Sequence, residues 1–353
     1  MSRGVPGGTL HILIALFTLS ALICVHELGH YLFARWAGVA VEEFAIGFGP
    51  ILASYRGEHT LWTLRLFPLG GFVAPATRGR RSVNRASPLS RLLLLLGGVI
   101  GNFIGAVLIL ALILTIGKRM DRFDSAQEAG DSWLLDVRDA RVYVASVVVD
   151  PTGNQPFLPG DEILKVNGAP THYIVDVINY RALSVDTLQL TIRREGKVIP
   201  VVLQEKDMPL LDLVEDQLVQ ANPISALLVA ADITSTTLYK ITCALPSIFT
   251  EIFQEPTESL QGPVAIVAES AAASERGLTD LLRMAWVISV SLIVMNLLPI
   301  PGLDGGRILF LLPELTLRRK LNDTLETILT AMGAIGLLLL TIFVVINDIR
   351  NLL

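Results

Sequence analysis

The stretch LHILIALFTLSALICVHELGHYLF, residues 10–33, carries the pentapeptide His26-Glu27-Leu28-Gly29-His30 inside a largely apolar run. The run is long enough to cross the hydrocarbon of a bilayer as a helix. His26 and His30 are four residues apart, so on a helix they share one face and can bind one metal ion. Glu27 can then accept a proton from a water at that metal. Because these groups are costly in hydrocarbon, they need a compensating partner, and the run predicts a metal site within a membrane span.

Other interpretations of the pentapeptide stay open. A chance H-E-x-x-H occurs in ordinary helices, although an apolar span offers neither histidine an easy solvated state. A proton relay in a transporter, or a helix that lines a water-filled cavity, would also place histidines at this depth.

Composition supports a membrane protein. Of the 353 residues, 52% are hydrophobic and 17% are charged, below the charge content of about 25% that is usual for soluble domains. The net charge of -5 gives no reason to expect a nucleic-acid partner. Cys24 and Cys243, the two cysteines, exclude a disulfide scaffold and a cysteine-rich zinc module.

Four apolar runs approach or exceed the ~20 residues that a span needs; they cover residues 10–36, 92–116, 281–300 and 328–346. The first is too long, and too rich in charged residues, for a signal peptide.

Arginine distribution predicts the orientation. Two connections are basic, between spans one and two and between spans three and four; their cations are Arg35, Arg56, Arg65, Arg78, Arg80, Arg81, Arg85 and Arg91, and Arg307, Arg318, Arg319 and Lys320. By the positive-inside rule both connections are cytoplasmic. The termini and the long acidic segment between spans two and three are then outside the cytoplasm.

A third metal ligand is expected just after span three, in the segment NLLPIPGLDGGR, residues 296–307. His26 is about 24 Å along span one, taking 1.5 Å per residue, and Asp304 follows a span of the same direction. Pro299 and Pro301 must break the helix, which is tolerated at membrane depth only against protein or a wet cavity. Gly305 and Gly306 are expected to let the chain turn after the aspartate. Asp304 could instead be a solvated carboxylate or a cap on the next helix.

Asn296 is the other polar residue at this end of span three. It could donate a hydrogen bond to a substrate carbonyl or to a developing oxyanion. It could equally satisfy backbone carbonyls freed by the nearby prolines.

Together, H-E-x-x-H and N-x-x-P-x-P-x-L-D-G resemble the site-2 protease family of intramembrane zinc metalloproteases, especially bacterial members that cut anti-sigma factors. Three further segments agree: residues 43–50 are similar to the family's segment after the first span, residues 64–73 to its membrane-associated β-hairpin, and Gly98 with Asn102 to its second-span motif. The resemblance is weakest over residues 118–140. Many bacterial relatives carry two PDZ modules, whereas this chain has room for one.

The resemblance implies a set of roles. His26, His30 and Asp304 would bind Zn²⁺, and Glu27 would be the general base and then the acid for the leaving amine. Asn296 and Asn102, with Gly70 and Gly71 of the hairpin, would hold substrate near the metal. The substrate would be a transmembrane protein, such as an anti-sigma factor already cut by another protease, or a remnant signal peptide. The setting would be the lipid bilayer of the bacterial inner membrane, with the active site near its cytoplasmic side.

Residues 118–208 are interpreted as a PDZ-like domain. The run LPGDEILKVNG, residues 158–168, resembles a PDZ signature; residues 187–194 and 198–203 alternate as strands around a tight Glu195-Gly196 turn. This domain could capture an extended peptide, or could only bar bulky substrates from the site.

The predicted fold is a polytopic α-helical membrane protein with about four spans, a membrane-associated β-hairpin and an inserted extracytoplasmic PDZ-like domain. Its parts are 1–117, 118–208, 209–280 and 281–353. In the third, residues 222–253 predict an amphipathic helix on the outer membrane surface; a fifth span is the alternative, and it would carry Asp304 to the wrong side. Besides a protease, the sequence leaves open an ion or metal transporter using buried His and Asp, and a catalytically silent adaptor.

Overall fold

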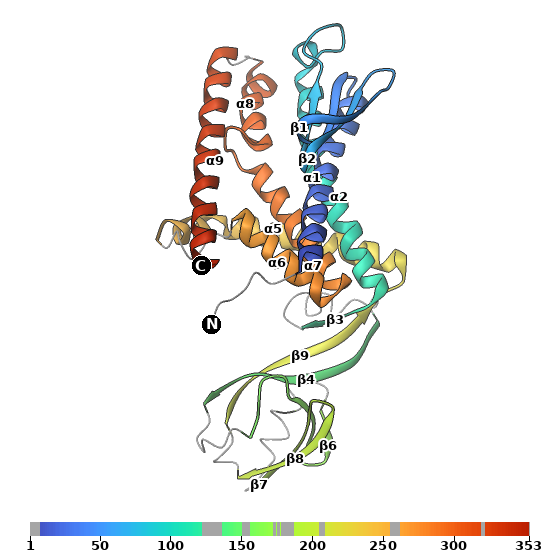
Figure 1. Ribbon diagram of the computed structural model, residues 1–353, viewed down its shortest axis with the longest axis vertical. Coiled ribbons are helices and arrows are strands. Elements are labelled where there is room, and N and C mark those ends of the chain that lie inside the picture. Colours follow the sequence, from blue (N-terminus) through green and yellow to red (C-terminus); the bar gives the residue numbers. More distant parts are fainter. Residues whose placement is uncertain are drawn as a thin grey trace. The chain divides into compact units, whose positions relative to one another are not determined.

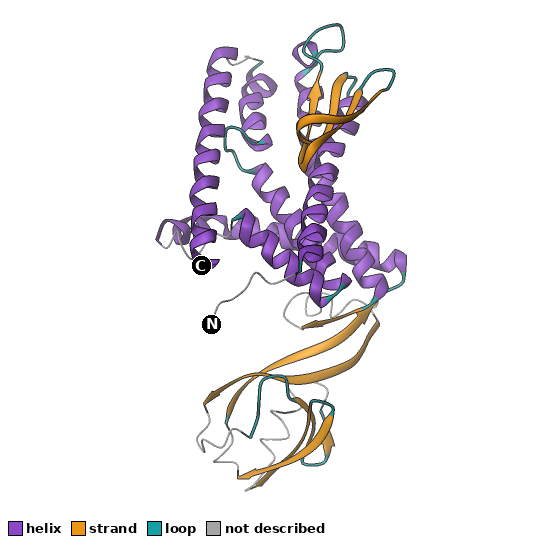
Figure 2. Cartoon of the chain, viewed as in Figure 1, coloured by secondary structure: helices purple, strands orange, loops and turns teal. Residues whose placement is uncertain are grey.

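The computed structural model describes residues 8–121, 136–149, 156–171, 174, 177, 187–204, 209–254, 262–318 and 322–352 (Figure 1). The chain divides into two compact units. One combines Met1–Leu110 with Thr234–Leu353, and the other is Ala111–Ile233. Figure 2 shows the strands in two separate groups, one in each unit.

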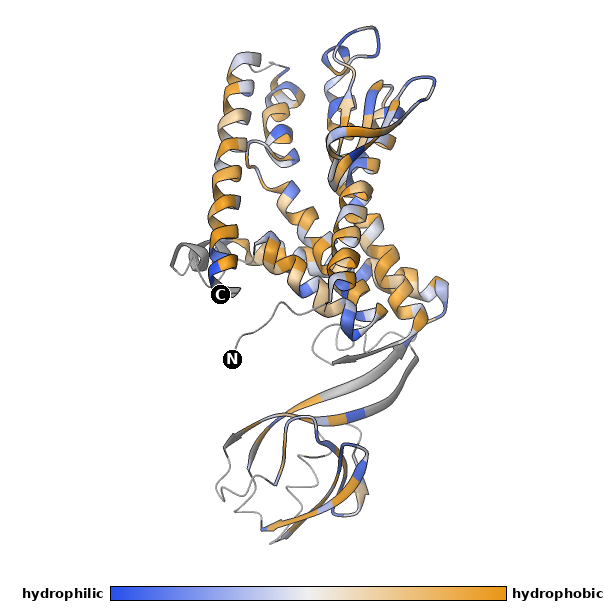
Figure 3. Cartoon of the chain, viewed as in Figure 1, coloured by the Kyte–Doolittle hydropathy of each residue, from blue (hydrophilic) through white to orange (hydrophobic). Residues whose placement is uncertain are grey.

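Five helices of the described residues are long and apolar enough to cross a membrane: α1 (Thr9–Trp36), α2 (Pro88–Ile116), α5 (Pro223–Gln254), α7 (Leu278–Leu297) and α9 (Asp323–Leu352). Figure 3 shows apolar residues along the length of α1, α2 and α9, as lipid contact requires. Four of these helices correspond to the four predicted runs, although α7 ends at Leu297, before the predicted end at residue 300. The fifth, α5, covers the predicted surface helix, so the four-span arrangement stays a prediction.

The break after the third predicted span is confirmed. Helix α7 ends at Leu297, and Leu298 is extended, with φ -60° and ψ 139°. The next helix, α8 (Asp304–Leu317), begins at the aspartate. The cause is local: Pro299 and Pro301 cannot donate to helix carbonyls.

The glycines after Asp304 play a different part from the predicted one. Gly305 and Gly306 are in the first turn of α8, and the positive φ of this segment, +104°, belongs to Gly302 before the aspartate. A Cβ on Gly305 would lie 2.3 Å from the Leu298 carbonyl oxygen, and one on Gly306 2.2 Å from that of Ile300. They are glycines because the broken segment packs onto this turn, and the predicted turn at 305–306 is wrong.

Strands β1 (Val41–Arg56) and β2 (Leu61–Pro75) form the sheet that follows α1. Residues 43–46 of β1 pair with 71–74 on one side and with 61–64 on the other, while 51–56 pair only with 61–65. The hairpin is therefore folded on itself, and its two edges are 51–56 and 71–75. The predicted hairpin at 64–73 is corrected: that stretch is part of one strand, and its partner is β1.

Glycines allow α1 and α2 to pack closely. A Cβ on Gly29 would lie 2.1 Å from the Gly97 carbonyl oxygen, and one on Gly101 would lie 2.8 Å from that of Val25. Small residues at four-residue spacing are a common means of bringing helices together in membranes. Gly29, the fourth residue of the pentapeptide, is thus needed for packing.

A buried aspartate of α9, Asp348, is hydrogen-bonded to the start of α6 (Pro263–Arg276). The Asp348 carboxylate accepts hydrogen bonds from the backbone N–H groups of Gly262, at 3.1 Å, and Ala265, at 3.0 Å. It thereby caps the first turn of α6, where backbone donors have no partner within the helix. The part of α5 from Thr234 onward runs across the direction of α9 (Figure 1), and Thr234 Oγ1 accepts a hydrogen bond from Trp286 Nε1 of α7 at 3.2 Å.

The second unit contains a seven-stranded sheet of order β3-β9-β4-β5-β7-β8, with β6 beside β5. Its strands are β3 (Lys118–Asp121), β4 (Asp136–Val149), β5 (Glu162–Val166), β6 (Ala169–Pro170), β7 (Thr187–Arg194), β8 (Lys197–Gln204) and β9 (Leu210–Gln220). The predicted turn at Glu195-Gly196 is confirmed, with φ 49° and 79°. Strand β9 pairs with β3 and β4, so the sheet continues beyond the predicted boundary at 208.

The core of this unit is apolar, around Phe157, Ile163, Leu188 and Ile192. Beside it, the buried Asp161 accepts hydrogen bonds from Arg194 Nε at 2.7 Å and Nη2 at 2.6 Å. Burial opposes ionisation of this carboxyl, but Arg194 outweighs it and holds the pKa of Asp161 below its usual value. Residues 122–135, 150–155, most of 172–186 and 205–208 of the predicted PDZ-like domain are outside the described residues, and the PDZ assignment stays a prediction.

Candidate metal centre

Helix α1 presents His26 and His30 to the interior of the helical unit. Both side chains are buried, each with 8% of its surface exposed, whereas Leu28 and Leu32 on the other face are exposed. The two Nε2 atoms are 3.1 Å apart, and the rings are nearly perpendicular at 88°. The four-residue spacing brings the nitrogens together as the sequence predicts.

Asp304 completes a three-atom cluster. The N-cap position of α8 is occupied by Leu303, and Asp304 is the first helical residue. Asp304 is buried, and its Oδ2 lies 3.3 Å from His26 Nε2 and 3.2 Å from His30 Nε2. The described residues supply this buried oxygen with no hydrogen bond of good geometry. The alternatives of a solvated carboxylate or a helix cap are therefore not what the structure contains.

The cluster fits a zinc ion. Its three atoms form a triangle with sides of 3.1, 3.2 and 3.3 Å. Ligands at corners of a tetrahedron with metal bonds of about 2.0 Å are separated by about 3.3 Å. Two imidazoles and one carboxylate are also a donor set that leaves a fourth position for water or substrate. Among the described residues, this is the group of His, Cys, Asp and Glu that could hold a metal ion.

Helix α2 supports both imidazoles from behind. His30 Nδ1 is 2.8 Å from the main-chain carbonyl oxygen of Leu94, and His26 Nδ1 is 3.2 Å from the side-chain amide of Asn102. Between these contacts is Gly98, where a Cβ would lie 2.4 Å from His30 Nε2 and 2.6 Å from His26 Nε2. Because Gly98 has no side chain, it leaves room for the two imidazoles. The Leu94 contact could not be found in the sequence, because any residue has a carbonyl.

Glu27 borders strand β2. Its carboxylate interacts electrostatically with His26, His30 and Asp304, and it accepts a hydrogen bond from the backbone N–H of Val73. A Cβ on Gly71 would lie 3.5 Å from Glu27 Cγ. The edge 71–75 of the folded sheet thus passes directly beside the predicted base.

The predicted substrate-holding residues are in different environments. Gly70 and Gly71 belong to β2; Gly71 lies beside Glu27, whereas Gly70 faces the ring of Phe48. Asn296 is half-buried, with its Nδ2 donating to the Leu292 carbonyl of its own helix at 3.0 Å. Asn102 is fully buried, with 0% of its surface exposed. The structure therefore brings Asn102 to a metal ligand, and no surface of its side chain is open to a substrate.

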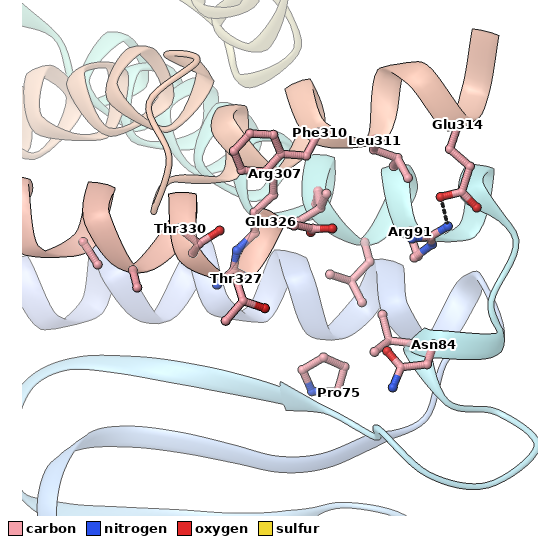
Figure 4. Close-up of a pocket in the computed structure, with 15 residues that line it drawn as sticks. Pro75, Asn84, Arg91, Arg307, Phe310, Leu311, Glu314, Glu326, Thr327 and Thr330 are labelled. Carbon is pink, nitrogen blue, oxygen red and sulfur yellow. Dashed lines mark ion pairs between the residues drawn. The ribbon is translucent and has the colours of Figure 1, made fainter. Parts of the chain in front are cut away.

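A cavity of about 870 Å³ lies on the other side of Leu94 from His30, and its wall contains neither the three cluster residues nor Glu27. Leu94 and Leu95 of α2, Pro75 at the end of β2, and Arg307, one turn after Asp304, contribute to its wall. Figure 4 shows the ion pair of Arg91 with Glu314 at one end and Arg307 with Thr327 and Thr330 at the other. The cavity is large enough for several side chains, and its lining is both apolar and charged.

Residues 14–340 of the chain match Peptidase family M50, which is the site-2 protease family. The chain belongs to this family. It is 31% identical over 351 residues to a candidate zinc metalloprotease of Clostridium perfringens, covering 96% of this chain and 98% of that one. It is 30% identical to a candidate zinc metalloprotease of Synechocystis, with 96% and 94% covered, and 29% identical to a candidate chloroplast membrane metalloprotease of Arabidopsis thaliana, with 95% and 78% covered.

This M50 protein is accordingly a zinc-dependent metalloendopeptidase. Its apolar helices make it a multi-pass membrane protein with a β domain, and its setting is lipid. The prediction of a protease is confirmed, and the transporter alternative has no support in the family match.

Gly98→Ala tests whether α2 shapes the metal centre. The added methyl group would overlap both imidazoles, so we expect metal affinity to fall by on the order of 10–100-fold, the size of effect that disturbed ligand orientation has elsewhere. Bound zinc per chain, measured on detergent-purified protein against a competing chelator, reports the change. Gly336→Ala, in α9, is the matched control because nothing lies within 4 Å of its Cβ position; equal zinc binding by both variants would contradict the assignment.

Proposed function

We propose that this protein is an intramembrane endopeptidase in which His26, His30 and Asp304 hold zinc and Glu27 is the general base. The observation that carries this proposal is the triangle of ligand atoms in a span, with Glu27 and an edge strand next to it. We propose that Asn296, Gly70 and Gly71 contact substrate, with Gly71 next to Glu27.

The chemistry divides between the cofactor and the protein. Zinc, when bound, supplies Lewis acidity that polarises the scissile carbonyl and acidifies water. Glu27 takes a proton from the attacking water and gives it to the leaving nitrogen, so the water adds to the carbonyl carbon as the C–N bond breaks. Leu94 and Asn102 keep the imidazoles aimed at one point, and the apolar surroundings limit access of bulk water.

A transmembrane helix hides its peptide bonds, so cleavage requires a local change to extended structure. The edge 71–75 of the folded sheet supports strand addition as the means. It pairs with β1 on one side, and its other side has no strand partner among the described residues. Because Gly71 and Val73 adjoin Glu27, a segment added to this edge would pass the base directly.

The cavity extends this path. Pro75 closes the edge strand and is also part of the cavity wall, and Leu94 joins that wall to His30. We infer that the cavity receives the chain on the cytoplasmic side of the scissile bond. Its charged groups suit residues near a membrane surface, where polar side chains begin.

We also propose an orientation and a biological setting. Basic connections after α1 and before α9 support a cytoplasmic position for the end of α1 that carries the metal centre. The β unit is then extracytoplasmic, and α5 lies on the outer surface of a bacterial inner membrane. Anti-sigma factors trimmed by another protease, or remnant signal peptides, are the proposed substrates in regulated intramembrane proteolysis.

Glu27→Gln tests the proposed base. Glutamine keeps the size of the side chain but cannot take the proton, so cleavage of a transmembrane substrate in detergent should fall by at least 10²–10⁴-fold, the usual range for general acid–base catalysis. The zinc content should remain about one ion per chain, because Glu27 is not a ligand. Full activity in this variant would remove Glu27 from the mechanism, and zinc loss would mean that it helps to hold the metal.

Photo-crosslinking at the two sheet edges tests strand addition. A benzoyl-phenylalanine at Phe72, in a Glu27→Gln background, should crosslink to a bound transmembrane substrate at several times the yield of the same group at Tyr55. Both positions are aromatic and lie in opposite edge segments, so Tyr55 is the matched control. Similar yields from both positions, or a higher yield from Tyr55, would rule out the edge 71–75 as the docking strand.

The native cysteines test the position of α5. Cys243 is exposed on α5, whereas Cys24 is partly buried within α1. If α5 lies on the outer surface, a membrane-impermeant maleimide added to spheroplasts should label Cys243 and leave Cys24 unlabelled. If α5 crosses the membrane from the β unit, Cys243 is near its cytoplasmic end, and labelling should require permeabilised cells.

A further inference from the structure

The two imidazoles of the metal centre have unequal supports on α2. His30 Nδ1 faces a main-chain carbonyl at 2.8 Å, which can only accept a hydrogen bond. His26 Nδ1 faces a side-chain amide at 3.2 Å, which can either donate or accept, depending on which end is turned toward the ring. The Leu94 carbonyl therefore requires a proton on His30 Nδ1, whereas the Asn102 amide can pair with His26 Nδ1 whether or not that nitrogen carries a proton.

Metal binding decides which nitrogen of each imidazole carries the proton. The Nε2 atoms converge on Asp304, so each imidazole gives its Nε2 lone pair to the metal. A neutral imidazole has one N–H group, and that group must then be at Nδ1. Leu94 already offers an acceptor to His30. His26 needs one as well, and the group within reach is Asn102.

We propose that Asn102 is the positioning residue of His26, and that in the zinc-loaded protein its Oδ1 accepts the His26 Nδ1–H. The nitrogen is the nearer amide atom in the structure; a half-turn of the amide exchanges nitrogen and oxygen with almost no change in shape. This role replaces the direct substrate contact that the family resemblance implies, and it rests on the proposed zinc ligands.

The surroundings of Asn102 suit positioning and exclude substrate. The residue has 0% of its surface exposed, and its main-chain carbonyl accepts a hydrogen bond from Ser289 Oγ at 3.0 Å. Ser289 belongs to α7, which leads into the broken segment before Asp304. The residue that orients His26 is thus hydrogen-bonded to α7, the helix that precedes the segment carrying Asp304, and α1, α2 and α7 meet at this point.

Substitutions of Asn102 separate the two roles. Asn102→Leu keeps the volume and removes both hydrogen-bonding atoms, so we expect the zinc dissociation constant of full-length protein in detergent to rise by 10–100-fold. Asn102→Asp keeps an acceptor at the same place, so its zinc affinity should stay within about threefold of wild type, the conservative rescue that the mechanism predicts. With cobalt in place of zinc, the visible spectrum should change in the leucine variant and return toward wild type in the aspartate variant.

The control is Asn296→Leu, the same substitution at an amide that bonds its own helix. Because Asn296 is proposed to contact substrate and not zinc, this variant should raise the KM for substrate and leave zinc affinity unchanged. Wild-type zinc affinity in Asn102→Leu, with a raised KM for substrate, would overturn the proposal in favour of substrate holding. Loss of zinc from Asn102→Asp would also overturn it, and this variant decides the matter even if the leucine variant does not fold. Failure of the wild-type protein to bind zinc would instead count against the proposed function.

Discussion

The cost of placing ionisable groups within a membrane span is the constraint on which the rest of this structure depends. His26, His30 and Asp304 are all buried, and each would be strongly unfavourable in hydrocarbon without a partner. The three side-chain atoms that face one another lie within 3.3 Å, so a single divalent cation could satisfy all three. The cluster is therefore a stabilising centre for the helices as well as a site for chemistry.

Convergence of the ligands requires close approach of backbones, and glycine makes it possible. Gly29, Gly97 and Gly101 let α1 and α2 approach until a Cβ would overlap a carbonyl. At that distance the Leu94 carbonyl and the Asn102 amide reach the outer nitrogens of the two histidines. Gly305 and Gly306 have the same function where the broken segment packs on α8. The geometry of the site therefore depends on these glycines as well as on the side chains that form the cluster.

Sequence reasoning predicted that His26, His30 and Asp304 would lie together, and the structure brings them together; their role as zinc ligands stays a prediction. It misjudged some of their neighbours. The four-residue spacing of the histidines and the helix-breaking prolines are local signals, and both act in the structure as expected. The predicted turn at Gly305 and Gly306 is wrong, because these glycines lie in a helix and are required by close packing. The predicted β-hairpin is present, but its bounds differ: β1 and β2 form it, and residues 64–73 lie within β2, because strand pairing joins residues that the local pattern cannot relate.

The sequence by itself determined that an apolar helix carries H-E-x-x-H and that a later span breaks before Asp304, because helix periodicity and proline geometry are properties of neighbouring residues. Only the tertiary structure decided that Asp304 meets the histidines, that a sheet edge passes Glu27, and that Asn102 is behind His26. These are contacts between distant segments. They depend on how helices pack, and a backbone carbonyl such as that of Leu94 has no signature in any sequence.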